Sequence, residues 1–138
     1  MTNDKLAESY LIKAEKRLNI LPVLFKESDY SDVIREAQEI VELALKGLLR
    51  YVGIEPPKWH DVGEIIVENI NRFPPRLQAE CKKIAEISRK LRIERERSFY
   101  GDEVSFASPD ELYDETDAKE AMEWAGFIVR IVKENVGR

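Results

Sequence analysis

The residues best suited to chemistry lie between positions 92 and 102. They are Arg92, Arg95, Arg97, Phe99, Tyr100 and Asp102. Arginine forks bind phosphate oxygens in pairs and aromatic rings stack on bases, so this set fits a nucleotide or an RNA phosphate. A guanidinium on the buried face of a helix needs an anionic partner, because burying an unpaired charge is costly. A carboxylate such as Asp102 or Glu103 would give a structural ion pair instead, and the residues taken alone favour this pairing.

The apolar spacing places these residues at the end of one helix in an all-α protein. Apolar residues recur three and four apart, which predicts four to five helices in an up-down antiparallel bundle. We expect them at about residues 4–25, bent at Pro22, then at 30–52, 62–73 and 76–98, and last from a cap at Asp114 or Thr116 to about 136. The last helix is apolar nearly all round, which predicts either the central helix or half of a subunit interface.

The helix expected at 76–98 changes character along its length. One apolar row repeats every seven residues, namely Leu77, Ile84, Leu91 and then Ser98. A neighbouring row consists of Cys81, Ser88 and then Arg95. The stripe that faces the core is therefore expected to become polar and cationic towards its end.

Composition limits the function classes. A chain of 138 residues with 43% hydrophobic and 36% charged residues predicts one globular domain, 1–138, and excludes a disordered chain. No apolar stretch approaches the roughly 20 residues that cross a bilayer, so we expect a cytoplasmic protein without a membrane anchor. Abundant Glu, Lys and Arg beside scarce Gln and Thr indicate a thermophilic source.

Charge is distributed unevenly along the chain. The net charge of -5 argues against a protein whose whole surface binds nucleic acid. Residues 76–97 nevertheless hold eight basic and four acidic residues, whereas residues 101–123 hold nine acidic residues and one lysine. A basic helix followed by an acidic loop, expected at 101–115, is the main polarity of the sequence.

Other polar residues receive structural interpretations. One cysteine, Cys81, and one histidine, His60, cannot build a zinc site, so we expect no metal and no cofactor, and Cys81 is interpreted as a core residue. His60 is interpreted as bonding locally before a helix capped by Asp61, and Trp59 as packing. Lys46 is interpreted as part of a solvated helix face. The carboxylates of the acidic loop lack the spacing of a calcium site.

Three segments resemble HEPN domains. Residues 30–49 (YSDVIREAQEIVELALKGLL) are similar to their second helix, residues 59–65 (WHDVGEI) to the start of their third, and residues 92–102 (RIERERSFYGD) to the signature that ends their fourth. The resemblance covers nearly the whole chain. It implies a helical bundle of the HEPN and nucleotidyltransferase-substrate-binding-subunit type, a homodimer, and a cleft where two copies of the signature meet. It also implies a minimal nucleotidyltransferase as partner, as in toxin–antitoxin modules.

The signature in this chain is degenerate. The nuclease members carry arginine, four to six residues, histidine, one residue and tyrosine; here Arg92 and Tyr100 fit, but Ser98 stands where histidine belongs. RNA cleavage through the 2′-hydroxyl needs a group that titrates near neutrality, which serine is not. We therefore expect ribonuclease activity to be absent or weak. The resemblance also implies that Tyr100 is a candidate for modification by the partner.

The favoured function is therefore a homodimer that binds nucleotide or RNA phosphates and acts with a nucleotidyltransferase partner. One alternative is an active ribonuclease toxin in which His60 or a water chain replaces the missing base. Another is a purely structural assembly subunit whose arginines are locked to carboxylates.

Overall fold

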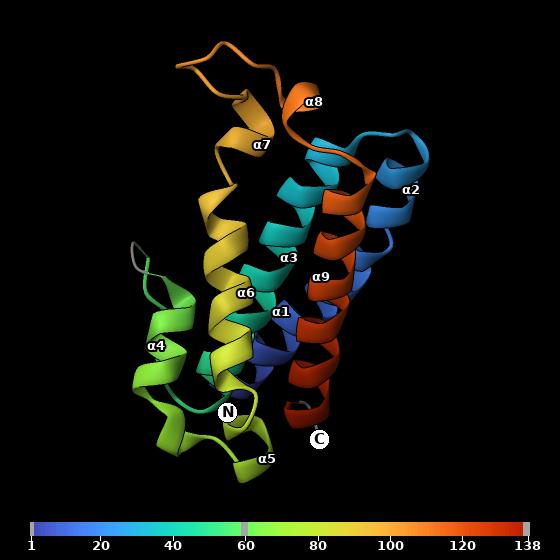
Figure 1. Cartoon of the computed structure of the whole chain (residues 1–138). Helices are drawn as coiled ribbons and strands as arrows, with labels where there is room; N and C mark the ends of the chain where they lie inside the picture. Colours follow the sequence, from blue (N-terminus) through green and yellow to red (C-terminus); the bar gives the residue numbers. More distant parts are fainter. Residues whose placement is uncertain (1, 59–60, 137–138) are drawn as a thin grey trace.

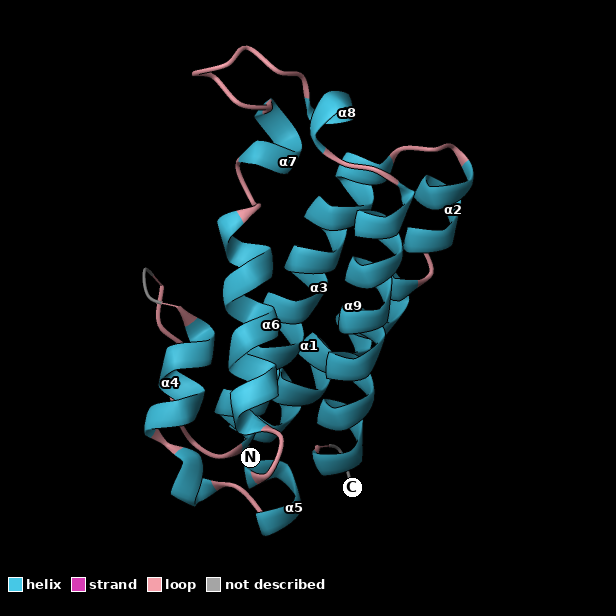
Figure 2. Ribbon diagram, viewed as in Figure 1, coloured by secondary structure: helices cyan, strands magenta, loops and turns pink. Residues whose placement is uncertain are grey.

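The apolar periodicity produces helices along the chain. The computed structural model describes residues 2–58 and 61–136. Within these ranges the single β-type pairing is an isolated bridge between Asp102 and Ala107, and Figure 2 shows helices joined by loops. The all-α fold class is therefore confirmed. No helix of the described ranges is both long enough and apolar enough to cross a bilayer.

The long helices lie alongside one another, and the short ones cluster at the two ends of the bundle (Figure 1). Helices α7 and α8 are at one end, and α5 is at the other. In chain order the elements are α1 (Thr2–Leu18), α2 (Leu21–Lys26), α3 (Tyr30–Tyr51), α4 (Val62–Glu68), the 3-10 turn η1 (Ile70–Arg72), α5 (Pro75–Gln78), α6 (Cys81–Ile93), α7 (Arg97–Tyr100), α8 (Pro109–Leu112) and α9 (Glu115–Asn135).

Helix α3 is the centre of the bundle. Helices α1 and α9 pack along it, and α2, α4, α6 and α7 also contact it. No residue from 31 to 49 is exposed, and Ile40, Leu45 and Leu48 are completely buried or nearly so. Of the two alternatives for the last helix, the central position is wrong, because α3 occupies it and α9 leaves Glu123 and Arg130 exposed. The other alternative, half of a subunit interface, stays a prediction.

Two expected helices are interrupted. The helix predicted at 4–25 ends at Leu18 and restarts at Leu21, with Pro22 in the first turn of α2. Proline lacks the N–H that a continuing helix needs but fits the first turn of a new one, so the chain starts again here rather than bending. The helix predicted at 76–98 is divided into α5, α6 and α7.

The termini of the later helices also differ from the prediction. The helix predicted at 62–73 ends at Glu68 and continues as η1. The loop predicted at 101–115 contains α8, which begins with a capping box between Ser108 and Glu111. Of the two cap residues considered for α9, Asp114 is the one that accepts a hydrogen bond, from the backbone of Asp117.

The start of α4 is fixed to α6 by one carboxylate. Asp61 Oδ1 accepts the backbone N–H of Gly63 at 3.0 Å, which caps α4, and also the hydroxyl of Ser88 at 3.3 Å. The expected cap is therefore present. Trp59 and His60, for which a packing and a local bonding role were predicted, lie outside the described residues.

Candidate functional site

The site lies where α6 ends and the chain turns into α7. After Ile93 the backbone tightens into three-residue hydrogen bonds, from Glu94 N to Leu91 O and from Arg95 N to Arg92 O. This turn interrupts the helical rotation, so the arginines that follow do not continue one row. They are directed to two different sides of the molecule.

Arg95 lies towards the central helix. Its guanidinium Nη2 is 3.8 Å from Glu39 Oε2 on α3, and 44% of its side chain is exposed. Its carbonyl oxygen accepts hydrogen bonds from Arg35 Nη1 at 3.0 Å and from Ser98 Oγ at 3.1 Å. Arg95 is thus anchored by its backbone, while its guanidinium makes a long, half-exposed ion pair with Glu39 and helps to lower the pKa of the Glu42 carboxyl.

Ser98 is a buried residue. Its exposed fraction is 1%, and its hydroxyl donates to the Arg95 carbonyl oxygen. The row of Leu77, Ile84 and Leu91 is buried as predicted, and Ser98 continues it into the core. At the place where the family signature has histidine, the side chain therefore stabilises the turn and does not face solvent.

The two aromatic residues of α7 are at the surface. Phe99 is 53% and Tyr100 is 64% exposed, and their rings meet edge to face with centroids 4.9 Å apart. The Arg35 guanidinium lies 4.8 Å from the centroid of the Phe99 ring. A cation on one aromatic face orients the ring without covering it. Both rings are accessible for stacking, and Tyr100 is accessible for modification.

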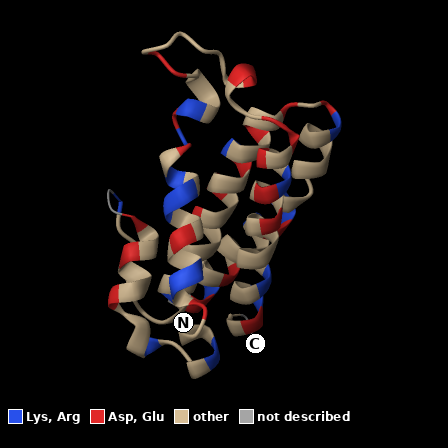
Figure 3. Cartoon of the chain, viewed as in Figure 1, with Lys and Arg blue, Asp and Glu red and all other residues tan. Residues whose placement is uncertain are grey.

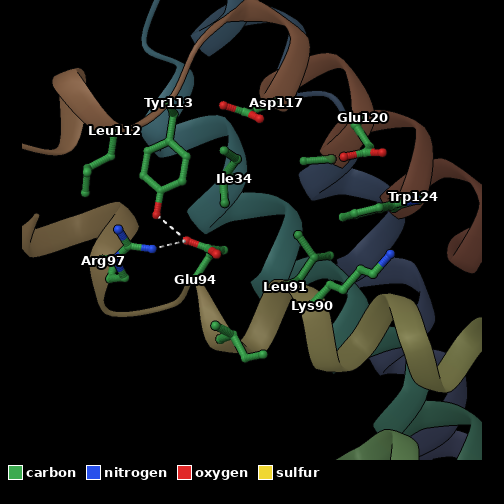
Figure 4. A pocket seen from close by; sticks show the side chains of 12 residues that line it. Ile34, Lys90, Leu91, Glu94, Arg97, Leu112, Tyr113, Asp117, Glu120 and Trp124 are labelled. Carbon is green, nitrogen blue, oxygen red and sulfur yellow. Dashed lines mark hydrogen bonds and ion pairs between the residues drawn. The ribbon is translucent and has the colours of Figure 1, made fainter. Parts of the chain in front are cut away.

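Arg97 and Asp102 lie at the same end of the bundle as Arg95 but on a different side of it. Arg97 lies 3.6 Å from Glu94 Oε1 and 3.8 Å from Asp102 Oδ2. Figure 4 shows Arg97 and Tyr113 converging on Glu94 at the edge of a pocket of about 360 Å³ between α6, α8 and α9. Asp102 is held by backbone N–H groups of Val104 and Ser105, which lower its pKa.

The structure therefore brings together only some of the site residues that were predicted from the sequence. Arg95, Phe99 and Tyr100 share one side, whereas Arg97 and Asp102 lie in the structural ion pair that the sequence considered as an alternative. Arg92 is partly buried and lies one helical turn after Ser88 on α6.

Sequence reasoning missed a charged hollow beside Arg95. It has a volume of about 260 Å³ between α1 and α3 and is lined by Lys13, Arg17, Glu39, Glu42, Leu43 and Lys46. Burial opposes ionisation of Glu42, but hydrogen bonds from Lys46 and Gln38 outweigh it and lower the pKa of the Glu42 carboxyl. The prediction of a solvated face for Lys46 is wrong, because its side chain is only 27% exposed and lies 2.9 Å from Glu42 Oε2. A periodicity argument treats each helix separately and does not predict the packing of α1 beside this face.

The arrangement can hold an anion and stack a base. No group of three or more His, Cys, Asp or Glu side chains suited to a metal ion occurs among the residues that the structure describes. Cys81 is buried, as predicted, and burial raises the pKa of its thiol. The half-exposed Arg95, on the same side as two exposed rings, is therefore the feature of this site best suited to binding a ligand.

Comparison with known proteins gives one finding. A family model described as "HEPN domain" matches residues 7–135, nearly the whole chain. Searches of curated proteins and of solved structures found no match.

Proposed function

The chain belongs to the HEPN domain family, and from that premise we propose that it is a homodimer that binds the phosphates of a nucleotide or an RNA. In this proposal it acts with a minimal nucleotidyltransferase in a toxin–antitoxin-like module. The observation that carries the proposal is the half-exposed Arg95 guanidinium, on the same side as the exposed rings of Phe99 and Tyr100. A phosphate can replace the distant Glu39 carboxylate as its partner, because arginine binds phosphate through two hydrogen bonds.

Ribonuclease chemistry is not part of this proposal. Ser98 occupies the histidine position, is buried, and donates its hydroxyl hydrogen bond to a backbone carbonyl. A serine hydroxyl does not titrate near neutral pH and cannot exchange protons with a 2′-hydroxyl efficiently. The active-toxin alternative would need a water chain or His60 as the base, and His60 lies outside the described residues.

Tyr100 is the proposed point of action of the partner. Its ring is 64% exposed, so its hydroxyl oxygen is accessible to a second protein. In the proposed transfer this oxygen attacks the α-phosphorus of ATP held by the nucleotidyltransferase. A tyrosyl–phosphate bond forms, pyrophosphate leaves, and the phenolic proton passes to a base or to water. Intact mass measured after incubation with the partner and ATP would show the added nucleotide, and Tyr100→Phe would abolish it.

The structural alternative is favoured by the ion pairs of Arg95 with Glu39 and of Arg97 with Asp102. Titration calorimetry with ATP and with a short single-stranded RNA separates the two. We expect Arg95→Gln to weaken binding about tenfold or more, as charge-assisted hydrogen bonds to phosphate require. Arg76→Gln is the matched control, since Arg76 is exposed on α5 at the opposite end of the bundle. Absence of binding to the wild-type protein at millimolar ATP would refute the proposal.

A further inference from the structure

The pocket between α6, α8 and α9 has no part in the proposed function. It has a volume of about 360 Å³ and lies at the same end of the bundle as Arg95, on the side where Arg97 meets Glu94. Small-molecule sites in proteins have volumes of roughly 300–1,000 Å³, so a compact organic molecule fits in this space. The side chains that line the pocket indicate the chemistry of such a molecule.

The floor of the pocket is apolar. Ile34 of α3, Leu91 of α6 and Ala121 of α9 line it, and all three side chains are buried. Two half-buried aromatic side chains, Tyr113 and Trp124, line it as well. In Figure 4, Ile34 lies between these two rings. A surface of this kind binds the hydrocarbon part of a ligand, because it removes apolar area from water.

Two cations line the pocket on the side of α6 and α7. Lys90 Nζ is 3.9 Å from Glu86 Oε1. Arg97 is 3.6 Å from Glu94 Oε1 and 3.8 Å from Asp102 Oδ2. These distances exceed the roughly 2.7–2.9 Å of a charge-assisted hydrogen bond, and both cationic side chains are about half exposed. Such long, exposed ion pairs are weak, so Lys90 and Arg97 can turn to an anionic group of a ligand.

Two carboxylates line the pocket on the side of α9. Asp117 and Glu120 lie one turn apart there, and both residues are exposed. Asp117 Oδ2 accepts the backbone N–H of Asp114 at 3.0 Å, which fixes this carboxylate beside the pocket. Figure 3 shows basic positions at the end of α6 and the start of α7, and acidic positions at the start of α9. The two walls of the pocket therefore carry opposite charges.

This lining excludes ligands that carry one sign of charge. Three carboxylates, including Glu94, face two cations, so a molecule with several phosphates is repelled. A simple amine would have to approach the Trp124 ring beside Lys90, whose Nζ already lies 5.6 Å from the ring centroid. In contrast, opposite charges on either side of an apolar floor are complementary to a molecule that has both an anionic and a cationic group.

We propose that this pocket binds a small zwitterion with an apolar side chain, namely a free amino acid or a dipeptide. The ligand carboxylate pairs with Lys90 and Arg97, and its ammonium group pairs with Asp117 and Glu120. Its side chain lies on the apolar floor. This binding site is separate from Arg95 and adds a second ligand to the phosphate of the proposed function.

Titration calorimetry with four compounds tests the ligand class. Phenylalanine and leucyl-phenylalanine are both zwitterions and distinguish a free amino acid from a dipeptide, whereas phenethylamine lacks the carboxylate and phenylpropionate lacks the ammonium group. We expect at least one zwitterion to bind at millimolar concentration or below. Each single-charge compound should bind about tenfold more weakly, because it loses the charge-assisted hydrogen bonds at one wall. Absence of binding by both zwitterions, or equal binding by a single-charge compound, would overturn the proposal.

Variants of the two walls test where the ligand binds. Lys90→Gln should weaken binding of the zwitterion and of phenylpropionate about tenfold but not binding of phenethylamine, and Glu120→Gln should show the opposite preference between the two single-charge compounds. Lys82→Gln on α6 and Glu123→Gln on α9 are the matched controls, since both residues are exposed and neither lines the pocket. All four variants should keep the melting temperature of the wild type. Equal losses in the wall variants and the controls would contradict the proposal.

Competition with ATP separates this site from the proposed function. ATP is proposed to bind at Arg95, and Arg95 does not line the pocket. An excess of ATP should therefore leave the affinity for the zwitterion unchanged, and displacement of the zwitterion by ATP would refute a separate site. A protein that binds the zwitterion but not ATP refutes only the phosphate site, and one that binds ATP but neither zwitterion refutes only this pocket.

Discussion

Gly63 of α4 and Ala85 of α6 are in direct backbone contact. A Cβ atom on Gly63 would stand 2.8 Å from Ala85 Cα and 3.0 Å from its carbonyl oxygen. Beside this contact, Asp61 accepts the hydroxyl of Ser88, so the first turn of α4 is held against the middle of α6 in two ways. The close approach fixes the chain that precedes α4 relative to the helix that ends at the candidate site.

Gly63→Ala should therefore destabilise the protein. The added methyl group meets backbone atoms that cannot rotate away, and overpacking of this kind costs about 1–3 kcal/mol. Urea denaturation measures the change in free energy of unfolding. Gly126→Ala is the control, because Gly126 lies inside α9 with no atom near its absent Cβ. That variant should be more stable by about 0.5–1 kcal/mol through helix propensity alone. Equal effects of the two variants would contradict the close contact.

Restoring the family's histidine should not restore nuclease activity. Ser98 is buried, and its hydroxyl bonds to the Arg95 carbonyl oxygen, so the larger imidazole of Ser98→His would be forced into the core. We expect a loss of about 1–3 kcal/mol of stability and no cleavage of fluorescently labelled single-stranded RNA. Ser98→Ala, which removes the hydroxyl without adding volume, serves as the stability control. Cleavage by Ser98→His that is lost on Arg92→Ala would disprove this reading of the turn.

The sequence predicted those features that depend on one helix at a time. The buried row of Leu77, Ile84 and Leu91, its continuation to Ser98, and the cap at Asp61 all follow from spacing within a segment. The ion pair of Arg95 with Glu39 joins residues far apart in the chain, so it cannot be predicted from the spacing of residues within one helix. The division of the helix predicted at 76–98 was missed for a related reason: tertiary contacts, and not local propensity, decide where α6 ends.

The pH dependence of the free energy of unfolding should show the titration of Asp32. A hydrogen bond with Asp29, burial, and repulsion from Asp29 and Asp110 raise the pKa of Asp32 from 3.8 to about 6, against the opposing charge of Arg35. The folded protein thus favours protonated Asp32. Its stabilising contribution is complete below about pH 4 and is lost as the pH rises through about 6.

Asp32→Asn tests that assignment. The amide mimics the protonated acid, so the variant should be more stable than the wild type at pH 7 and similar to it near pH 4. The free energy of unfolding of the wild type should rise between pH 7 and pH 5, and the variant should show a flatter profile in this window. Glu42 and Asp102, whose pKa values are lowered, lose their contributions only at more acidic pH and do not obscure it. Parallel profiles for the two proteins would refute the assignment.

Tyr113 should hold the segment after α8 onto α6. Its hydroxyl donates a 2.6 Å hydrogen bond to Glu94 Oε1, and burial together with Glu94 raises the pKa of the phenol. Tyr113→Phe should cost about 1–2 kcal/mol, because the bond has an ionised acceptor and is partly buried. Thermal denaturation measures the loss. Tyr51→Phe, at a more exposed position on α3, should change the melting temperature little. A stable Tyr113→Phe variant would show that the bond contributes nothing.

Glu39 should compete with a bound phosphate for Arg95. Its Oε2 is 3.8 Å from Arg95 Nη2 and 3.5 Å from Arg35 Nε, so one carboxylate partly neutralises two guanidinium groups at the proposed site. Glu39→Gln removes that charge and should increase the affinity for ATP about three- to tenfold at low salt, as expected for charges a few ångströms apart near a surface. The gain should decrease as salt screens the interaction. Glu86→Gln, which removes a more exposed carboxylate paired with Lys90 on α6, should leave the affinity unchanged. Titration calorimetry at two salt concentrations measures the gain in ATP affinity and its dependence on salt. If Glu39→Gln binds ATP like the wild type while Arg95→Gln binds it weakly, Arg95 contributes to the site without facing the phosphate, and the competition between carboxylate and phosphate does not exist.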